Sequence, residues 1–155
     1  MSAQPPPPPE PPPLPGASAP EPSAAGPSPE TGFWEERRTC FLTTPRPDGT
    51  PHLVPVGVTY DPETRLARVI SSRSSKKVRN VLAAGPGVAV AVSQAEGRRW
   101  CTLEGTAVIR DDPDSVADAE ARYTRRYKPP RPNPERVVIE IAVTRAMGTA
   151  RPPGW

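Results

Sequence analysis

Runs of β-branched and other apolar residues, separated by short turns, restrict this chain to a mainly β fold. We expect strands at 38–44, 52–60, 66–72, 88–93, 100–110 and 136–144, with turn signals such as Asp48-Gly49 and Asp61-Pro62 between them. Inside this series only two helices are expected, at 76–84 and after Asp112, which can cap a helix that starts at Pro113. Few helices and short turns favour antiparallel pairing. The predicted fold is a mainly β (α+β) six-stranded antiparallel barrel with short flanking helices.

Several of these elements carry further local predictions. The β-branched and alanine-rich run 88–93 predicts a strand that is buried on both faces, and Gly105 predicts a bulge in the strand at 100–110. Tyr123 and Tyr127 belong to the expected apolar stripe of the helix after Asp112, and 128–134 is predicted as a proline-rich breaker before the last strand.

The first 30 residues have a different composition from the rest of the chain. They hold 13 of the 26 prolines and lack lysine and arginine. A segment this poor in large apolar side chains cannot offset the entropy of ordering, so we predict a disordered proline-rich tail over 1–30. A folded domain is expected over 31–155, and the residues at 29–36 form an expected short helix at its entry, which Phe33 and Trp34 anchor to the domain.

The predicted domain is basic, because all 20 lysines and arginines lie in it against 14 acidic residues. This balance favours an anionic partner. A phosphorylated small molecule fits better than nucleic acid, since the few aromatic residues are not interleaved with basic ones on a strand. No apolar run is long enough to cross a membrane, and we expect a cytoplasmic protein.

The cysteines and the histidine give little support for metal or triad chemistry. Cys40 and Cys101 lie in apolar strand-like runs without a CxxC spacing, so we expect two buried free thiols. His52 is the single histidine of the chain, and it gives little support for a zinc site or for a Ser-His-Asp triad. We predict no metal and name no catalytic residue.

The segment 71–80 carries the strongest chemical signal in the chain. It places four serines and four basic residues between a predicted strand and a predicted helix. Free N–H groups at a helix N-terminus, with serine and lysine beside them, form an anion site, and such a site commonly holds a phosphate. A solvated helix start that Ser74 or Ser75 caps is the alternative reading.

Four segments of the chain resemble one family. They are Leu42-Thr43-Thr44 through Asp48-Gly49-Thr50-Pro51-His52, Val54-Pro55-Val56, Lys76-Lys77-Val78-Arg79-Asn80-Val81, and Leu103-Glu104-Gly105-Thr106-Ala107. In this order they resemble the split-barrel flavin-binding superfamily of pyridoxamine-phosphate oxidases, and more closely its branch that uses the deazaflavin coenzyme F420. The resemblance implies an FMN-binding split-barrel type of fold and a homodimer with the cofactor at the interface.

The resemblance also implies a role for particular residues. Lys77 and Asn80 match positions that hold the cofactor phosphate, and the backbone of 54–56 matches the strand that faces the ring. Arg98 and Arg99 are candidates, on charge alone, for the acidic tail of the coenzyme. The full predicted cofactor-binding set is Val54, Pro55, Val56, Ser71, Ser72, Ser75, Lys76, Lys77, Asn80, Arg98 and Arg99.

The function that follows from the resemblance is an F420-dependent oxidoreductase that transfers a hydride between the reduced deazaflavin and a small conjugated substrate. Three alternatives stay open: an FMN-binding flavoprotein of the same fold, a non-catalytic cofactor-binding protein, and a small barrel that binds nucleic acid. A protein whose cofactor performs the chemistry needs no catalytic triad of its own.

Overall fold

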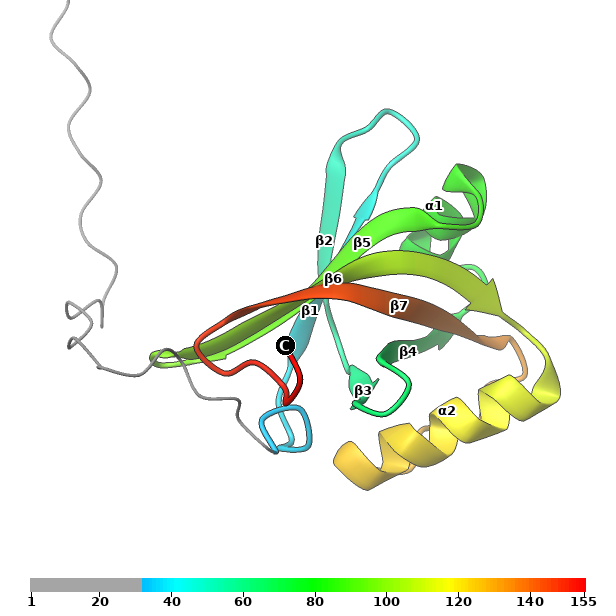
Figure 1. Cartoon of the computed structure of the whole chain (residues 1–155). Helices are drawn as coiled ribbons and strands as arrows, with labels where there is room; N and C mark the ends of the chain where they lie inside the picture. Colours follow the sequence, from blue (N-terminus) through cyan, green and yellow to red (C-terminus); the bar gives the residue numbers. More distant parts are fainter. Residues whose placement is uncertain (1–31) are drawn as a thin grey trace, which may run out of the picture.

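Seven strands pair in the order β2-β1-β5-β6-β7-β4-β3, and every pairing is antiparallel (Figure 1). The computed structural model describes residues 32–155, and the predicted tail over 1–30 lies outside them. The elements are β1 (Cys40–Pro45), β2 (Pro51–Val56), β3 (Thr59–Asp61), β4 (Leu66–Ser72), α1 (Lys76–Ala84), β5 (Val88–Glu96), β6 (Arg99–Arg110), α2 (Pro113–Arg126) and β7 (Arg136–Gly148). No helix in this range is long and apolar enough to span a membrane.

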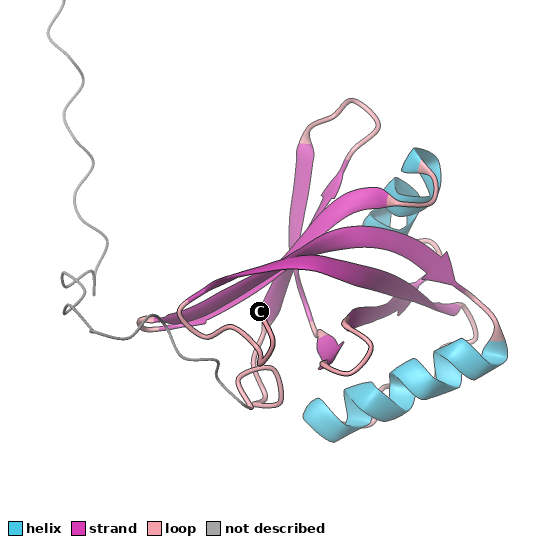
Figure 2. Ribbon diagram, in the orientation of Figure 1, coloured by secondary structure: helices cyan, strands magenta, loops and turns pink. Residues whose placement is uncertain are grey.

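The prediction of a mainly β antiparallel sheet with two flanking helices is confirmed (Figure 2). The sheet has seven strands rather than six, because the predicted strand at 52–60 divides into β2 and β3 at the two edges of the sheet. Between these two strands, side chains from the C-terminal end of α2 and from the residue after it form hydrogen bonds with the backbone of Val58. The Val58 N–H donates to the Tyr127 hydroxyl at 3.2 Å, and its carbonyl accepts from Arg126 Nη1 at 2.6 Å.

Two local predictions were wrong. Residues 32–36 form turns rather than a helix: Gly32 adopts φ 94°, and its carbonyl accepts from the N–H groups of both Glu35 and Glu36. Phe33 and Trp34 are nevertheless buried, as expected of anchors. The run 88–93, which we expected to be buried on both faces, instead alternates: Val90 and Val92 are buried, while Ala89 is exposed.

The core lies inside the curved sheet and under α1. Its largest fully buried side chains are those of Phe33, Leu42, Leu103, Ile139 and Ile141. Strands β6 and β7 form a long pair that is interrupted at Gly105, as predicted, by a register shift. Both cysteines are buried and free, as expected.

The pairing of β4 with β7 determines where the functional side chains meet. Because the two strands are antiparallel, Ser72 at the end of β4 lies opposite Arg136 at the start of β7. The residues after β4 therefore lie beside those that precede β7, and Arg73 N–H donates to the Glu135 carbonyl at 2.9 Å. The hydrogen bond between Asn133 and Ser72, which are 61 residues apart in the sequence, joins these two segments.

Candidate functional site

A cleft of about 530 Å³ opens where β2, β4, α1 and the segment before β7 meet. Its walls come from five parts of the chain: Pro55, Val56 and Gly57 from β2 and the residue after it, Ile70, Ser71 and Ser72 from β4, Lys77 from α1, Tyr123 from α2, and Lys128, Pro129, Pro130, Arg131, Asn133 and Arg136 from the region around the start of β7. Five residues of the predicted set, Pro55, Val56, Ser71, Ser72 and Lys77, therefore line one cavity.

The N-terminus of α1 at this cleft lacks a side-chain cap among the described residues. Ser75 occupies the N-cap position, but its hydroxyl makes no cap hydrogen bond and accepts instead from the Ser71 hydroxyl at 2.9 Å. The alternative reading of the sequence, in which Ser74 or Ser75 caps this helix, is therefore not supported for the side chain of Ser75. Because the first N–H groups of a helix have no intrahelical acceptor, this end of α1 is suited to an anion.

Lys77 is the cation best placed to meet such an anion. Its side chain is half-buried, and burial lowers the pKa of its ammonium group from the ordinary value. Burial disfavours the charged form of the amine, and no carboxylate among the residues that line the cleft offsets this effect. A half-buried cation without an acidic partner has lost part of its hydration. A bound anion would stabilise its charged form by compensating for this loss.

Asn80 lies beneath this surface rather than in the cleft lining. Its side chain is 1% exposed, and Nδ2 donates to Thr44 Oγ1 at 3.1 Å, while Oδ1 has no partner. His52, opposite Thr44 in the β1–β2 pair, also has a buried Nδ1 without a partner. Burial first, and then the charges of Arg46, Lys76 and Lys77, lower the pKa of this imidazole. Two buried polar atoms in this region, Asn80 Oδ1 and His52 Nδ1, therefore remain able to form a hydrogen bond.

A second groove of about 550 Å³ continues from the first. The two share Pro55, Val56, Gly57 and Tyr123. Tyr123 and Tyr127 stack with ring centroids 4.9 Å apart and form one wall. Gly57 allows this approach, because a Cβ there would lie 2.7 Å from Tyr123 Cε2. The sequence predicted both tyrosines as an apolar helix stripe and gave them no role in a site.

The remaining predicted residues lie elsewhere. Val54 sits on β2 opposite Leu42, outside the cleft lining, and Lys76 is exposed at the start of α1. Arg98 and Arg99 lie at the turn between β5 and β6, and Arg99 pairs with Glu36 at 3.0 Å. Since β5 starts next to the end of α1 and runs away from it, this turn is at the far end of the hairpin. Their role toward the coenzyme tail stays a prediction.

The sequence missed the contribution of the segment 128–136. We predicted 128–134 only as a proline-rich breaker before the last strand. In the fold Asn133 Nδ2 donates to Ser72 Oγ at 2.8 Å, so this segment is bound directly to the serine-rich end of β4. Antiparallel pairing of 66–72 with 136–144 would have placed this segment beside the end of β4. The sequence alone, however, does not show which strands pair.

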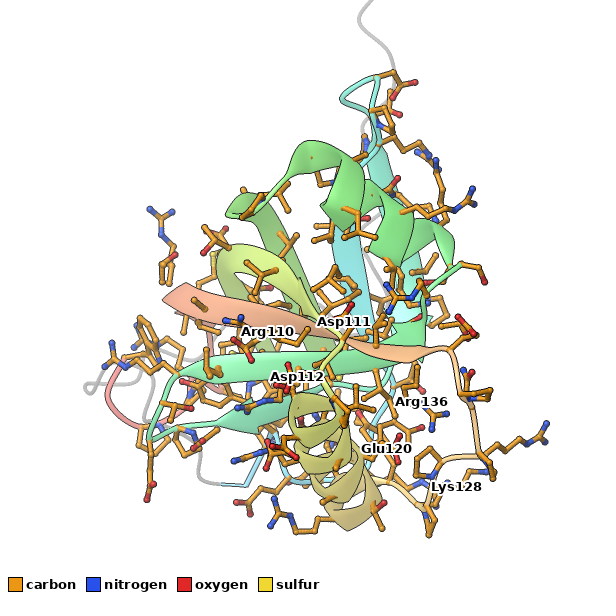
Figure 3. All side chains as sticks on the ribbon, turned by 90° about the vertical axis from the view of Figure 1, so that its right-hand side faces the viewer. Arg110, Asp111, Asp112, Glu120, Lys128 and Arg136 are labelled. Atoms are coloured by element: carbon orange, nitrogen blue, oxygen red, sulfur yellow. The ribbon has the colours of Figure 1, made fainter. Side chains whose placement is uncertain are left out.

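Arg136 holds this segment to α2. Its Nη1 lies 3.3 Å from Glu120 Oε1, and its Nη2 donates to the Arg131 carbonyl at 2.8 Å. Figure 3 shows Glu120, Arg136 and Lys128 along the side where α2 meets the start of β7. Arg136 is thus partly neutralised, whereas Lys77, Lys128 and Arg131 lack an acidic partner among the described residues. The cleft can accept a ligand with more than one negative charge.

Comparisons with known proteins agree on the class of fold and point to a cofactor. The model of the pyridoxamine 5'-phosphate oxidase family matches residues 31–149. An F420H(2)-dependent biliverdin reductase of Mycobacterium tuberculosis (strain CDC 1551 / Oshkosh) is 51% identical over 118 residues, which cover 76% of this chain and 84% of that protein.

Solved structures add further relatives. One described as an F420 reductase is 26% identical with a TM-score of 0.60, and the match covers 78% of this chain and 98% of that one. A pyridoxamine 5'-phosphate oxidase-related, FMN binding protein from Nostoc punctiforme shares the fold at 15% identity and a TM-score of 0.52, over 71% of this chain and 72% of that one.

Proposed function

The chain belongs to the pyridoxamine 5'-phosphate oxidase family, and we propose that it is an F420-dependent oxidoreductase that reduces a small conjugated substrate. The observation that carries the proposal is Lys77: a half-buried cation, next to an uncapped helix N-terminus, facing a cleft without a carboxylate. A site of this kind suits a phosphorylated cofactor. The F420H(2)-dependent relative, at 51% identity, favours the deazaflavin over FMN.

The residues of the cleft fit such a coenzyme. We propose that Lys77, Ser72 and the first N–H groups of α1 hold the phosphate, with Lys76 and Ser75 beside them. The edge strand at Pro55 and Val56 faces the ring; a proline leaves no N–H there to be satisfied. The bound coenzyme supplies the hydride, and the protein binds, orients and shields it.

The adjoining groove is the proposed position of the substrate. It opens directly from the cleft at Pro55 and Gly57, and the stacked rings of Tyr123 and Tyr127 give it a flat apolar wall. Flat π-surfaces favour planar conjugated molecules. Arg37 also lines this groove and is exposed, so a substrate that carries a carboxylate is compatible with it; Arg38, on the same wall, is already paired with Glu36 and Glu96.

Binding and turnover with each cofactor test the proposal. We expect purified protein to bind F420 tightly, to bind FMN weakly, and to oxidise F420H2 in the presence of a conjugated acceptor, as followed by the fluorescence and absorbance of the deazaflavin. Tight FMN binding without a response to F420 would favour the FMN alternative. Tight F420 binding without turnover on quinone, linear tetrapyrrole and nitro-aromatic acceptors would favour a non-catalytic carrier.

A Lys77→Ala variant locates the phosphate. We expect a loss of about 1 to 3 kcal/mol in F420 binding, a roughly 5- to 150-fold higher Kd, because a charge-assisted hydrogen bond in a half-buried position disappears. Arg79→Ala, an exposed cation on the same helix outside the cleft lining, is the matched control and should leave Kd unchanged. Equal affinities for Lys77→Ala and the wild type would mean that the phosphate is held elsewhere.

We further propose that the protein is a homodimer formed through the outer face of its sheet. Pro55, Phe41, Ser93, Thr102 and Met147 are successive cross-strand partners over five adjacent strands, so their side chains share one face. The side chains of Phe41 and Met147 in this row are 47% and 38% exposed. The exposed apolar side chains at the two ends of this row favour association, and Pro55 connects the row to the cleft.

Sedimentation of a Phe41→Asp variant tests the dimer. The wild type should sediment as a dimer and Phe41→Asp as a monomer, because an unpaired carboxylate buried in the interface costs several kcal/mol. Leu82→Asp serves as the control, since Leu82 is a comparably exposed apolar residue on α1, away from this row. A wild-type monomer at micromolar concentration would contradict the proposal. A cytoplasmic location stays a prediction.

A further inference from the structure

The cleft has more positive charge than a single phosphate needs. Lys77 and the N-terminus of α1 form one group at the end of β4. Lys128 and Arg131 form a second group in the segment that leads into β7, and both side chains are exposed on the rim. Neither has an acidic partner among the described residues, whereas Arg136 is paired with Glu120. The second group remains available for a ligand.

This second group is held in place by the fold. Asn133 Nδ2 donates to Ser72 Oγ at 2.8 Å, and Arg136 Nη2 donates to the Arg131 carbonyl at 2.8 Å. Pro132 and Pro134 restrict the backbone between these bonds, and Pro129 and Pro130 restrict it between Lys128 and Arg131. The entropy of ordering the segment has therefore been lost before any ligand arrives, which makes weak charge pairs on it more effective.

We infer that Lys128 and Arg131 bind the oligoglutamyl tail of the coenzyme, the chain of carboxylates that follows its phosphate. This inference rests on the proposed function and places the tail on the α2–β7 segment rather than at Arg98 and Arg99. A tail that leaves a phosphate at Lys77 meets Lys128 and Arg131 on the wall of the same cleft. It would have to reach the far end of the β5–β6 hairpin to meet Arg99, which pairs with Glu36 at 3.0 Å.

Two forms of the coenzyme separate tail binding from phosphate binding. One form carries several glutamates, and the other ends after the lactyl phosphate and carries none. Dissociation constants for both are measured by deazaflavin fluorescence for the wild type and for Lys128→Ala/Arg131→Ala. The double variant should bind the glutamylated form about tenfold more weakly and the form without glutamates as the wild type does, since two exposed ion pairs are lost.

Matched variants identify the cause of any loss. Lys77→Ala should weaken both forms equally, and Arg125→Ala/Arg145→Ala, which removes the same charge from exposed sites outside the cleft, should weaken neither. The more conservative Lys128→Gln/Arg131→Gln should reproduce the selective loss. Its unfolding midpoint, compared with that of the wild type, checks that the segment remains folded.

Three results would overturn the inference. Equal losses for both coenzyme forms in Lys128→Ala/Arg131→Ala would assign the segment to the phosphate. No loss for the glutamylated form would remove the segment from the site, and a selective loss in Arg98→Ala would move the tail to the turn between β5 and β6. In each of these cases the wild type still binds F420. Failure of the wild type to bind either form would instead contradict the proposed function itself.

Discussion

An Arg126→Met variant should lose about 3 kcal/mol of its free energy of unfolding. Arg126 is 6% exposed and donates to three acceptors: the Glu36 carbonyl at 2.9 Å, the Val58 carbonyl at 2.6 Å and Gln94 Oε1 at 2.7 Å. Methionine fills similar space but leaves these acceptors without a donor. Each buried acceptor that loses its partner costs about 1 to 3 kcal/mol, with smaller values where water can replace the donor.

The neighbouring arginine provides the control. Arg125 is exposed at the same end of α2, so Arg125→Met removes the same charge without removing a buried hydrogen bond. Urea unfolding of the two variants, monitored by far-ultraviolet circular dichroism, measures the difference. Similar midpoints for Arg125→Met and Arg126→Met would show that the three bonds contribute little beyond packing.

A Gly105→Ala variant should be destabilised by a similar amount, about 3 kcal/mol, at the upper end of the cost of overpacking. A Cβ at Gly105 would lie 2.1 Å from the Ala142 carbonyl oxygen and 2.8 Å from its carbon. Both are backbone atoms of β7, so no side-chain rotation can relieve the contact. The variant must separate β6 from β7 at the register shift or abandon the shift.

Thr106→Ala tests whether the effect belongs to this position alone. Thr106 is the next residue of β6 and is exposed, so its truncation should change stability by less than about 0.5 kcal/mol. Thermal unfolding of both variants, followed by calorimetry, gives the comparison. A Gly105→Ala protein as stable as Thr106→Ala would mean that the two strands have room to move apart.

Local patterns in the sequence predicted most of the secondary structure but not its division at 57–58. The helix at 76–84 is present as predicted, and Asp112 caps α2 by accepting from the Ser115 N–H at 3.0 Å. The end of the second predicted strand depends on Arg126 and Tyr127, which satisfy the backbone of Val58. These partners are 68 and 69 residues away in sequence, so no local pattern contains the information.

The same distinction applies to the candidate site. Lys77, Ser71 and Ser72 could be predicted because a cluster of serines and lysines at a strand–helix junction is chemically specific by itself. The segment with Lys128 and Arg131 could not, because its proximity to Ser72 follows from the β4–β7 pairing. Arg98 and Arg99 illustrate the converse: a basic pair is visible in the sequence, but its position relative to the cleft is a property of the fold.

The two edge strands determine how this sheet can meet another chain. At one edge, β2 carries Pro51 and Pro55, which have no N–H to offer to an added strand, and at the other edge β3 is three residues long. Neither edge is a good template for strand addition, the route by which open sheets grow into fibres. In the proposed homodimer, association would use the face of the sheet instead and would stop at a closed pair. A concentrated solution should accordingly resist fibril formation despite the exposed side chains of Phe41 and Met147.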